Sequence, residues 1–138
     1  QRLVQMGDDA SQRAGARLDF VACSGALLGV RGEVFRTAGG FDTAFGLDWG
    51  CEDLEFGWRA LQRGEVIAPV TPGGFHMTHA RPGRWIEHDR SLARFSTLHP
   101  HPAVEQLEHL LSADGTPDTY IEAVAHARND ARSERCAT

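Results

Sequence analysis

The chain has 138 residues, which is enough for one domain with its own core but hardly for two. Its hydrophobic fraction of 41% and charged fraction of 24% are those of an ordinary globular protein, and they exclude a disordered or fibrous chain. A net charge of -5 argues against a general nucleic-acid binder, and no apolar run approaches the ~20 residues that cross a bilayer.

The three cysteines give no sign of a disulfide framework or a zinc site. Cys23, Cys51 and Cys136 are widely separated, odd in number and lack C-x-x-C spacing. A reducing compartment fits such cysteines best, so we predict a cytoplasmic protein.

The first half of the chain predicts a mixture of strands and helices. Residues 1–17 are polar and are expected to form a lead-in segment. The continuous apolar run LDFVACSGALLGV, residues 18–30, predicts a buried strand or strand pair. RGEVFRTAGG predicts a short helix that turns Val34 and Phe35 inward and ends at the two glycines. Residues 41–51 are expected to form a loop.

A second helix is predicted from Glu52, because Leu54, Trp58 and Leu61 repeat at helical spacing and Gly64 is placed to end it. EVIAPV, residues 65–70, predicts a short strand, and FHMTHA a further extended segment.

Beyond residue 83 the pattern becomes helical. RWIEHDRSLARFSTLH predicts a helix, two prolines then interrupt the chain, and AVEQLEHLLS and DTYIEAVAHARNDAR predict two more helices. The organisation expected from the sequence is therefore a lead-in over 1–17, an α/β part over 18–83 and a helical C-terminal extension over 84–138.

The adjacent acids Glu52 and Asp53 allow two interpretations. Acidic side chains favour the first turn of a helix, where they accept hydrogen bonds from free amides and oppose the macrodipole. The same position also orients a carboxylate and keeps it ionised, as suits a base that takes a proton from a hydroxyl nucleophile.

Other candidates follow from residue type and position. His76 and His79 lie three apart, so on one strand they would face opposite sides; His79, where an extended segment gives way to a loop, is the better functional candidate. Asp42 after Gly-Gly-Phe is typical of a turn-forming aspartate. Trp49 before Gly50 offers an aromatic platform for a sugar ring, because glycine lets a ligand approach the backbone.

The stretch SGALLGVRGEVFRTAGGFDTAF, followed by WGCEDLEFGWRALQRGEVIAPV and FHMTH, resembles the C-terminal half of the catalytic domain of inverting GT-A glycosyltransferases. These are the family 2 type enzymes, with the polypeptide N-acetylgalactosaminyltransferases and β-1,4-galactosyltransferases among their relatives. The resemblance covers roughly residues 23–82. It implies a partial, Rossmann-like α/β domain. The sequence shows no nucleotide-binding half with its Asp-x-Asp motif, so we expect that the chain is a fragment, that this half lies on another chain, or that the chain is a stand-alone relic that no longer transfers sugars.

The resemblance also implies roles for individual residues. Asp53 corresponds to the catalytic base, Glu52 would hold the acceptor, and Trp49 with Gly50 would line the acceptor and donor-sugar pocket. His79 corresponds to the histidine that helps to coordinate a divalent cation, Mn²⁺ or Mg²⁺, below the nucleotide diphosphate. We add Asp42 and Arg81 as candidate substrate-binding residues, the latter as a phosphate contact.

The function expected from the sequence is therefore inverting transfer of a sugar from a nucleotide diphosphate sugar to a hydroxyl acceptor, by an enzyme or by a fragment of one. The alternative is a non-catalytic binding or assembly module of the same type that lacks the donor-binding half. Neither nucleic acid nor a membrane span is expected.

Overall fold

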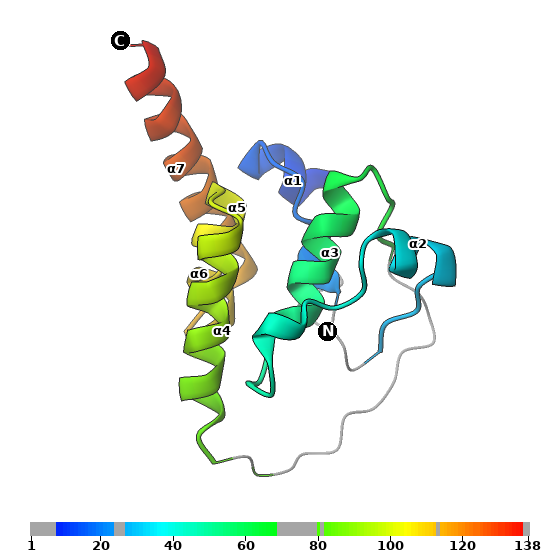
Figure 1. The fold of residues 1–138 in the computed structure, drawn as a ribbon. Coiled ribbons are helices and arrows are strands. Elements are labelled where there is room, and N and C mark those ends of the chain that lie inside the picture. The colour runs from blue at the N-terminus through cyan, green and yellow to red at the C-terminus, as the bar shows by residue number, and fades with distance from the viewer. Residues whose placement is uncertain (1–7, 24–26, 69–79, 81, 113, 137–138) are drawn as a thin grey trace. The chain divides into compact units, whose positions relative to one another are not determined.

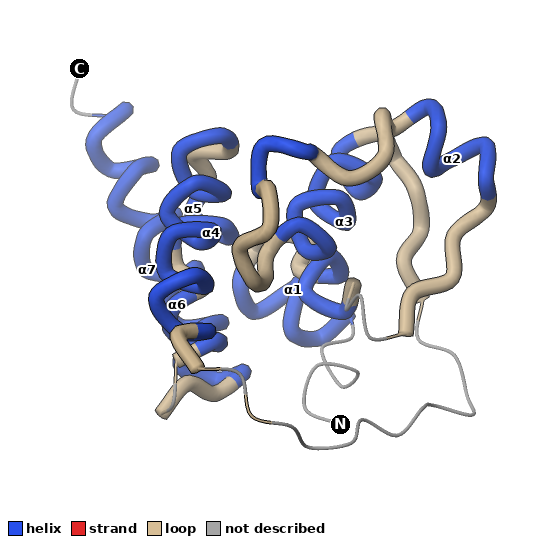
Figure 2. Tube along the Cα trace, turned by 60° about the horizontal axis from the view of Figure 1, so that its bottom comes forward, coloured by secondary structure: helices blue, strands red, loops and turns tan. Residues whose placement is uncertain are grey.

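The computed structural model describes residues 8–23, 27–68, 80, 82–112 and 114–136, and the chain divides into two compact units. The central unit comprises residues 19–95, and the split unit combines residues 1–18 with 96–138. Throughout the described residues the regular elements are helices, with no strand among them (Figures 1 and 2). In this part of the chain we find no helix that combines the length and the apolar character needed to cross a bilayer.

The central unit is organised around α3, which runs from Glu52 to Gln62. The other elements of this unit are the 3₁₀ helices η2 (Asp19–Ala22) and η3 (Thr43–Phe45), the short helix α2 (Gly32–Thr37), and α4 (Arg84–Leu98) as far as residue 95. α3 buries an apolar face whose members follow helical spacing, as expected of an amphipathic helix: Leu54, Trp58 and Leu61.

The core beside α3 is aromatic. The ring of Phe20, on η2, meets Trp58 edge to face at 5.1 Å between centroids and Phe95 at 6.1 Å. Such pairs add stability beyond the apolar area they bury. Gly57 lets η2 approach closely, because a Cβ at this position would lie 2.6 Å from the Cys23 sulfur. η2 therefore packs directly on the backbone of α3.

A partly buried arginine joins α3 to the end of α2. The guanidinium of Arg59 makes two hydrogen bonds to the Glu55 carboxylate, at 2.6 and 2.8 Å, and donates to the carbonyl oxygens of Ala38 and Gly40, the latter at 2.7 Å. Glu55 is only 2% exposed. This Arg59 clamp satisfies a buried charge and fixes the turn through Gly39, which adopts a φ of 85° that favours glycine.

The split unit packs three segments against α7, which runs from Pro117 to Cys136. These segments are α1 (Asp8–Ala14), α5 (Pro102–Glu105) and α6 (Glu108–Leu111). The start of α7 is defined locally, because the hydroxyls of Thr116 and Thr119 each accept from the other residue's amide at 3.1 Å. Inside, the hydroxyl of the fully buried Tyr120 donates to the carbonyl of Ala103.

The predicted α/β fold class is wrong for the described residues. In the run 18–30, residues 19–22 form a 3₁₀ turn and residues 27–31 are irregular, while 24–26 lie outside the described residues. Short apolar runs of this kind do not distinguish a strand from another buried segment. Residues 65–68 are also irregular, with Val66 82% exposed, so these four residues of the predicted strand 65–70 pair with no strand in the described part of the chain. The extended segment predicted over 75–80 lies outside the description except for residue 80.

The helical predictions fare better. The helices expected over 31–40, from 52, over 84–99 and over 118–132 are confirmed as α2, α3, α4 and α7. The helix predicted over 103–112 is instead broken into α5 and α6 around Leu107, a fully buried residue. Around the break, the amides of Leu107 and His109 donate to carbonyls three residues earlier, those of Val104 and Gln106, at 3.1 and 3.0 Å, so the regular α-helical bonding pattern is interrupted there.

Replacing Arg59 by methionine should destabilise the central unit by about 3–5 kcal/mol, because the buried Glu55 carboxylate then loses its partner. Urea unfolding followed by tryptophan fluorescence measures this change. Arg63→Met, at the exposed end of the same helix, is the matched control and should shift the free energy of unfolding by less than about 0.5 kcal/mol. Equal effects of the two substitutions would contradict a stabilising role of the Arg59 clamp.

His101 should make the split unit less stable in acid. Its Nδ1 caps α5 by accepting from the amide of Ala103 at 3.1 Å, and burial together with Arg128 lowers the pKa of His101 against a smaller opposing effect of Glu105. The folded state therefore disfavours the proton, so this stabilisation is present above the unfolded pKa of about 6.5 and is lost as pH falls through the lower folded pKa.

His101→Asn supplies a helix cap that does not titrate in this range. Urea unfolding at pH 7.5 and 5.0 should therefore show a smaller acid-induced loss of stability in His101→Asn than in the unmodified chain. An identical pH dependence of the two proteins would rule out His101 as the titrating group.

Candidate functional site

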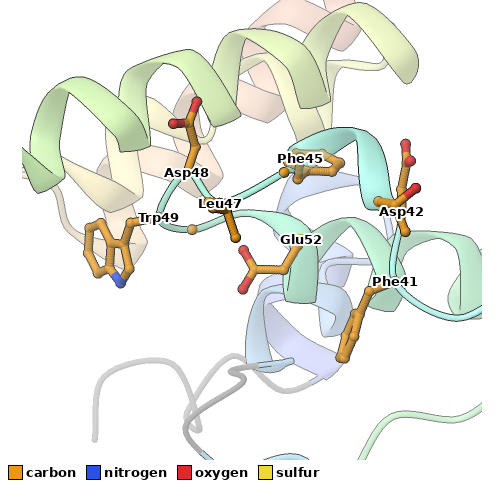
Figure 3. A pocket seen from close by; sticks show the side chains of 10 residues that line it. Phe41, Asp42, Phe45, Leu47, Asp48, Trp49 and Glu52 are labelled. Carbon is orange, nitrogen blue, oxygen red and sulfur yellow. The ribbon is translucent and has the colours of Figure 1, made fainter.

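A pocket of about 350 Å³ lies in the central unit, on the loop that leads from η3 into α3 (Figure 3). Its wall combines aromatic, apolar and acidic side chains with two glycines: Phe41, Asp42, Thr43, Phe45, Gly46, Leu47, Asp48, Trp49, Gly50 and Glu52. Almost the entire wall is therefore one continuous segment of sequence. Its conformation depends on how that segment is bent and held.

Local turns bend the segment. The carboxylate of Asp42 accepts from the amide of Ala44 at 2.8 Å and caps η3, in agreement with the turn-forming role expected from the sequence. Two consecutive residues before α3 then adopt positive φ, 93° at Gly50 and 69° at Cys51. Cys51 is the one non-glycine residue with positive φ in the described part of the chain, and it is buried. This sharp bend directs the chain into the first turn of α3.

Side chains of helix α4 also hold this segment in place. Arg90 forms a two-pronged ion pair with Asp48, with N–O distances of 2.7 and 3.1 Å. The Glu87 carboxylate accepts from the backbone amide of Trp49 at 3.2 Å. At Gly50 a Cβ would lie 3.2 Å from the His88 ring, so the loop and α4 meet closely at this glycine.

The two adjacent acids at the start of α3 have different surroundings. Glu52 lines the pocket, and Figure 3 shows its carboxylate on the side of the cavity between Trp49 and Phe41. Asp53 is not part of the wall; one of its oxygens accepts from the amide of Leu54 at 2.8 Å, in the first turn of its own helix. Of the two acids, Glu52 therefore lines the pocket, while Asp53 bonds to an amide of the helix terminus.

The pocket thus brings together four of the residues singled out from the sequence: Asp42, Trp49, Gly50 and Glu52. Asp53 is adjacent but off the wall, and the predicted contacts His79 and Arg81 lie outside the described residues. Sequence reasoning missed Asp48 and the supporting residues Glu87 and Arg90, which lie about forty positions further along the chain. No spacing rule connects such distant positions.

The predicted Mn²⁺ or Mg²⁺ site has no counterpart among the described residues, where no group of three or more His, Cys, Asp or Glu side chains could hold a metal ion. Asp48 is also bound to Arg90, which competes with a cation for its oxygens. The expected ligand His79 lies outside the described residues, so the metal site stays a prediction.

Comparisons with protein-family models, with curated proteins and with solved structures give no match for this chain. Together with the lack of strands among the described residues, this result corrects the resemblance drawn from the sequence. The Gly-Gly-Phe-Asp turn and the acid pair before a helix are short local patterns, and such patterns arise wherever a loop turns sharply into a capped helix. They do not identify a GT-A domain here.

The buried thiols at the site should be unreactive in the native protein. Burial, reinforced by the negative charges of Asp53 and Glu52, raises the pKa of Cys51 to about 12. Burial together with Asp53 raises the pKa of Cys23 to about 11. Only the exposed Cys136 should therefore react quickly with iodoacetamide at pH 8, whereas all three cysteines should react in urea.

Mass spectrometry of the alkylated peptides measures each rate, and Cys136→Ser is the control that should remove the fast reaction. Because both folded pKa values are raised, the corresponding stability is present below the unfolded thiol pKa of about 8.5 and is lost as pH rises toward 11 and 12. Rapid labelling of Cys51 in the folded chain would contradict the burial of this thiol at the start of α3.

Proposed function

We propose that the pocket binds a hydroxyl-bearing sugar and that the chain takes part in transferring a further sugar to it from a nucleotide diphosphate sugar. The observation that supports this proposal is the placement of the Trp49 indole and the Glu52 carboxylate on the wall of one pocket. Sugar rings have apolar faces that stack on aromatic rings and hydroxyls that donate to carboxylates, so this pair of groups suits a carbohydrate.

In this proposal Glu52 is the acid that contacts the acceptor. Glu52 lies in the first turn of α3, where the positive end of the helix dipole attracts negative charge, and an ionised carboxylate accepts the hydroxyl hydrogen bond that precedes proton removal. The hydroxyl oxygen then forms its bond to the anomeric carbon as the nucleotide diphosphate leaves, and the proton passes to Glu52. Asp53, the base expected from the sequence, acts in this proposal by capping the helix that positions Glu52.

Asp42 and Asp48 each contact an arginine in addition to lining the pocket. Asp48 is bound to Arg90, and Asp42 caps η3 and lies 4.0 Å from Arg94. Their charges are offset by neighbouring arginines, which leaves their side chains suited to orienting a ligand by accepting hydrogen bonds. Phe41 and Leu47 supply apolar contact area around these groups; Leu47 is 97% exposed.

Glu52→Gln should lower the rate of sugar transfer by about 10², because the amide still accepts a hydrogen bond but no longer takes up a proton. The assay combines the full chain with UDP- and GDP-linked sugars, neutral saccharide acceptors and Mg²⁺ or Mn²⁺, and follows nucleotide diphosphate release. Asp53→Asn should cost far less. Glu122→Gln, exposed on α7 in the other unit, is the matched control and should leave the rate unchanged.

The opposite order, with Asp53→Asn inactive and Glu52→Gln active, would contradict the assignment of the base. The alternative function is a non-catalytic binding module, and one observation favours it: the pocket wall offers groups for a single saccharide but no cluster that would hold a diphosphate and its metal. Saturable saccharide binding by the full chain without nucleotide release would identify this alternative.

A further inference from the structure

Arg84 lies beside the pocket on a pair of indole rings. It is the first residue of α4, and its guanidinium carbon is 4.7 Å from the ring centroid of Trp85 and 5.6 Å from that of Trp49. The two indoles meet edge to face, 5.9 Å between centroids, and Trp49 also belongs to the pocket wall. The guanidinium is thus linked to the pocket through one shared ring.

The surroundings of the Arg84 charge differ from those of the other arginine charges around the pocket. Arg90 and Arg94 face Asp48 and Asp42, whereas within the described residues Arg84 makes its contacts with the two indoles and forms no ion pair. Its position at the N-terminus of α4 also brings a positive charge to the positive end of a helix dipole, which is electrostatically unfavourable. Stacking on aromatic faces holds the planar group in place while its N–H donors stay available at their edges.

We propose that Arg84 binds the anionic group of a saccharide whose ring lies in the pocket against Trp49. Guanidinium recognises a carboxylate or a phosphate in the same two-pronged manner, so the ligand is a uronate or a phosphorylated sugar. This inference rests on the proposed saccharide pocket and adds the charge of its ligand. The neighbouring Asp48 does not exclude an anion, because Arg90 already offsets its charge.

Titration of the full chain with defined probes tests the inference, with the fluorescence of Trp49 and Trp85 as the readout. The probes are methyl β-D-glucuronide, glucose 6-phosphate and the neutral methyl β-D-glucoside, each at low and at high NaCl. At least one anionic probe should bind about tenfold more tightly than the neutral glycoside, with an advantage that shrinks in high salt. Which anionic probe gains identifies carboxylate or phosphate as the recognised group.

Arg84→Gln should remove the preference for the anionic probe, Arg84→Lys should retain part of it, and Arg63→Gln, far along α3 from the pocket wall, should retain all of it. A preference that survives in Arg84→Gln would overturn the inference, as would equal affinities of the unmodified chain for anionic and neutral probes. In both of those cases the saccharide pocket itself stands. Absence of binding by all three probes would overturn the saccharide pocket and this inference together.

Discussion

The ion pair between Arg59 and Glu55 is the contact on which the central unit depends. Glu55 would be a costly buried charge by itself, and Arg59 compensates that charge with two hydrogen bonds while also donating to the carbonyls of Ala38 and Gly40. One side chain therefore anchors the turn after α2 to the middle of α3. That turn leads directly into the loop that forms the pocket, so the clamp sets where the loop begins.

The other end of the loop is fixed by different forces. The positive φ values of Gly50 and Cys51 direct the chain into α3, and the ion pair of Asp48 with Arg90 ties the same stretch to α4. Between these supports the loop exposes apolar and aromatic side chains that a core would normally bury, Leu47 above all. A loop supported at both ends, with exposed apolar groups and the carboxylates of Asp42, Asp48 and Glu52 on its wall, is the arrangement expected of a ligand site.

The chemistry of that site follows from how its charges are distributed. Most acids near the pocket already have an arginine partner or a helix terminus, and these contacts make them positioning groups. In the proposed function, Glu52 takes up the hydroxyl proton because it lies both on the pocket wall and in the first turn of α3. The guanidinium of Arg84 lies over the indole of Trp49, so the proposed hydroxyl and anion contacts share this ring.

The sequence by itself determined the long helices and the local shape of the site. The helical spacing of apolar residues in α3, α4 and α7 is visible within a few turns of sequence. The loop residues that line the pocket are likewise neighbours along the chain. The spacing of Glu55 and Arg59 was also visible, but only the tertiary structure decided that Glu55 is buried and that Arg59 also binds carbonyls about twenty residues away. The same holds for residues 18–30. An apolar run requires burial, but whether it forms a strand or a 3₁₀ turn depends on the surface that covers it. Here that surface is α3 at Gly57.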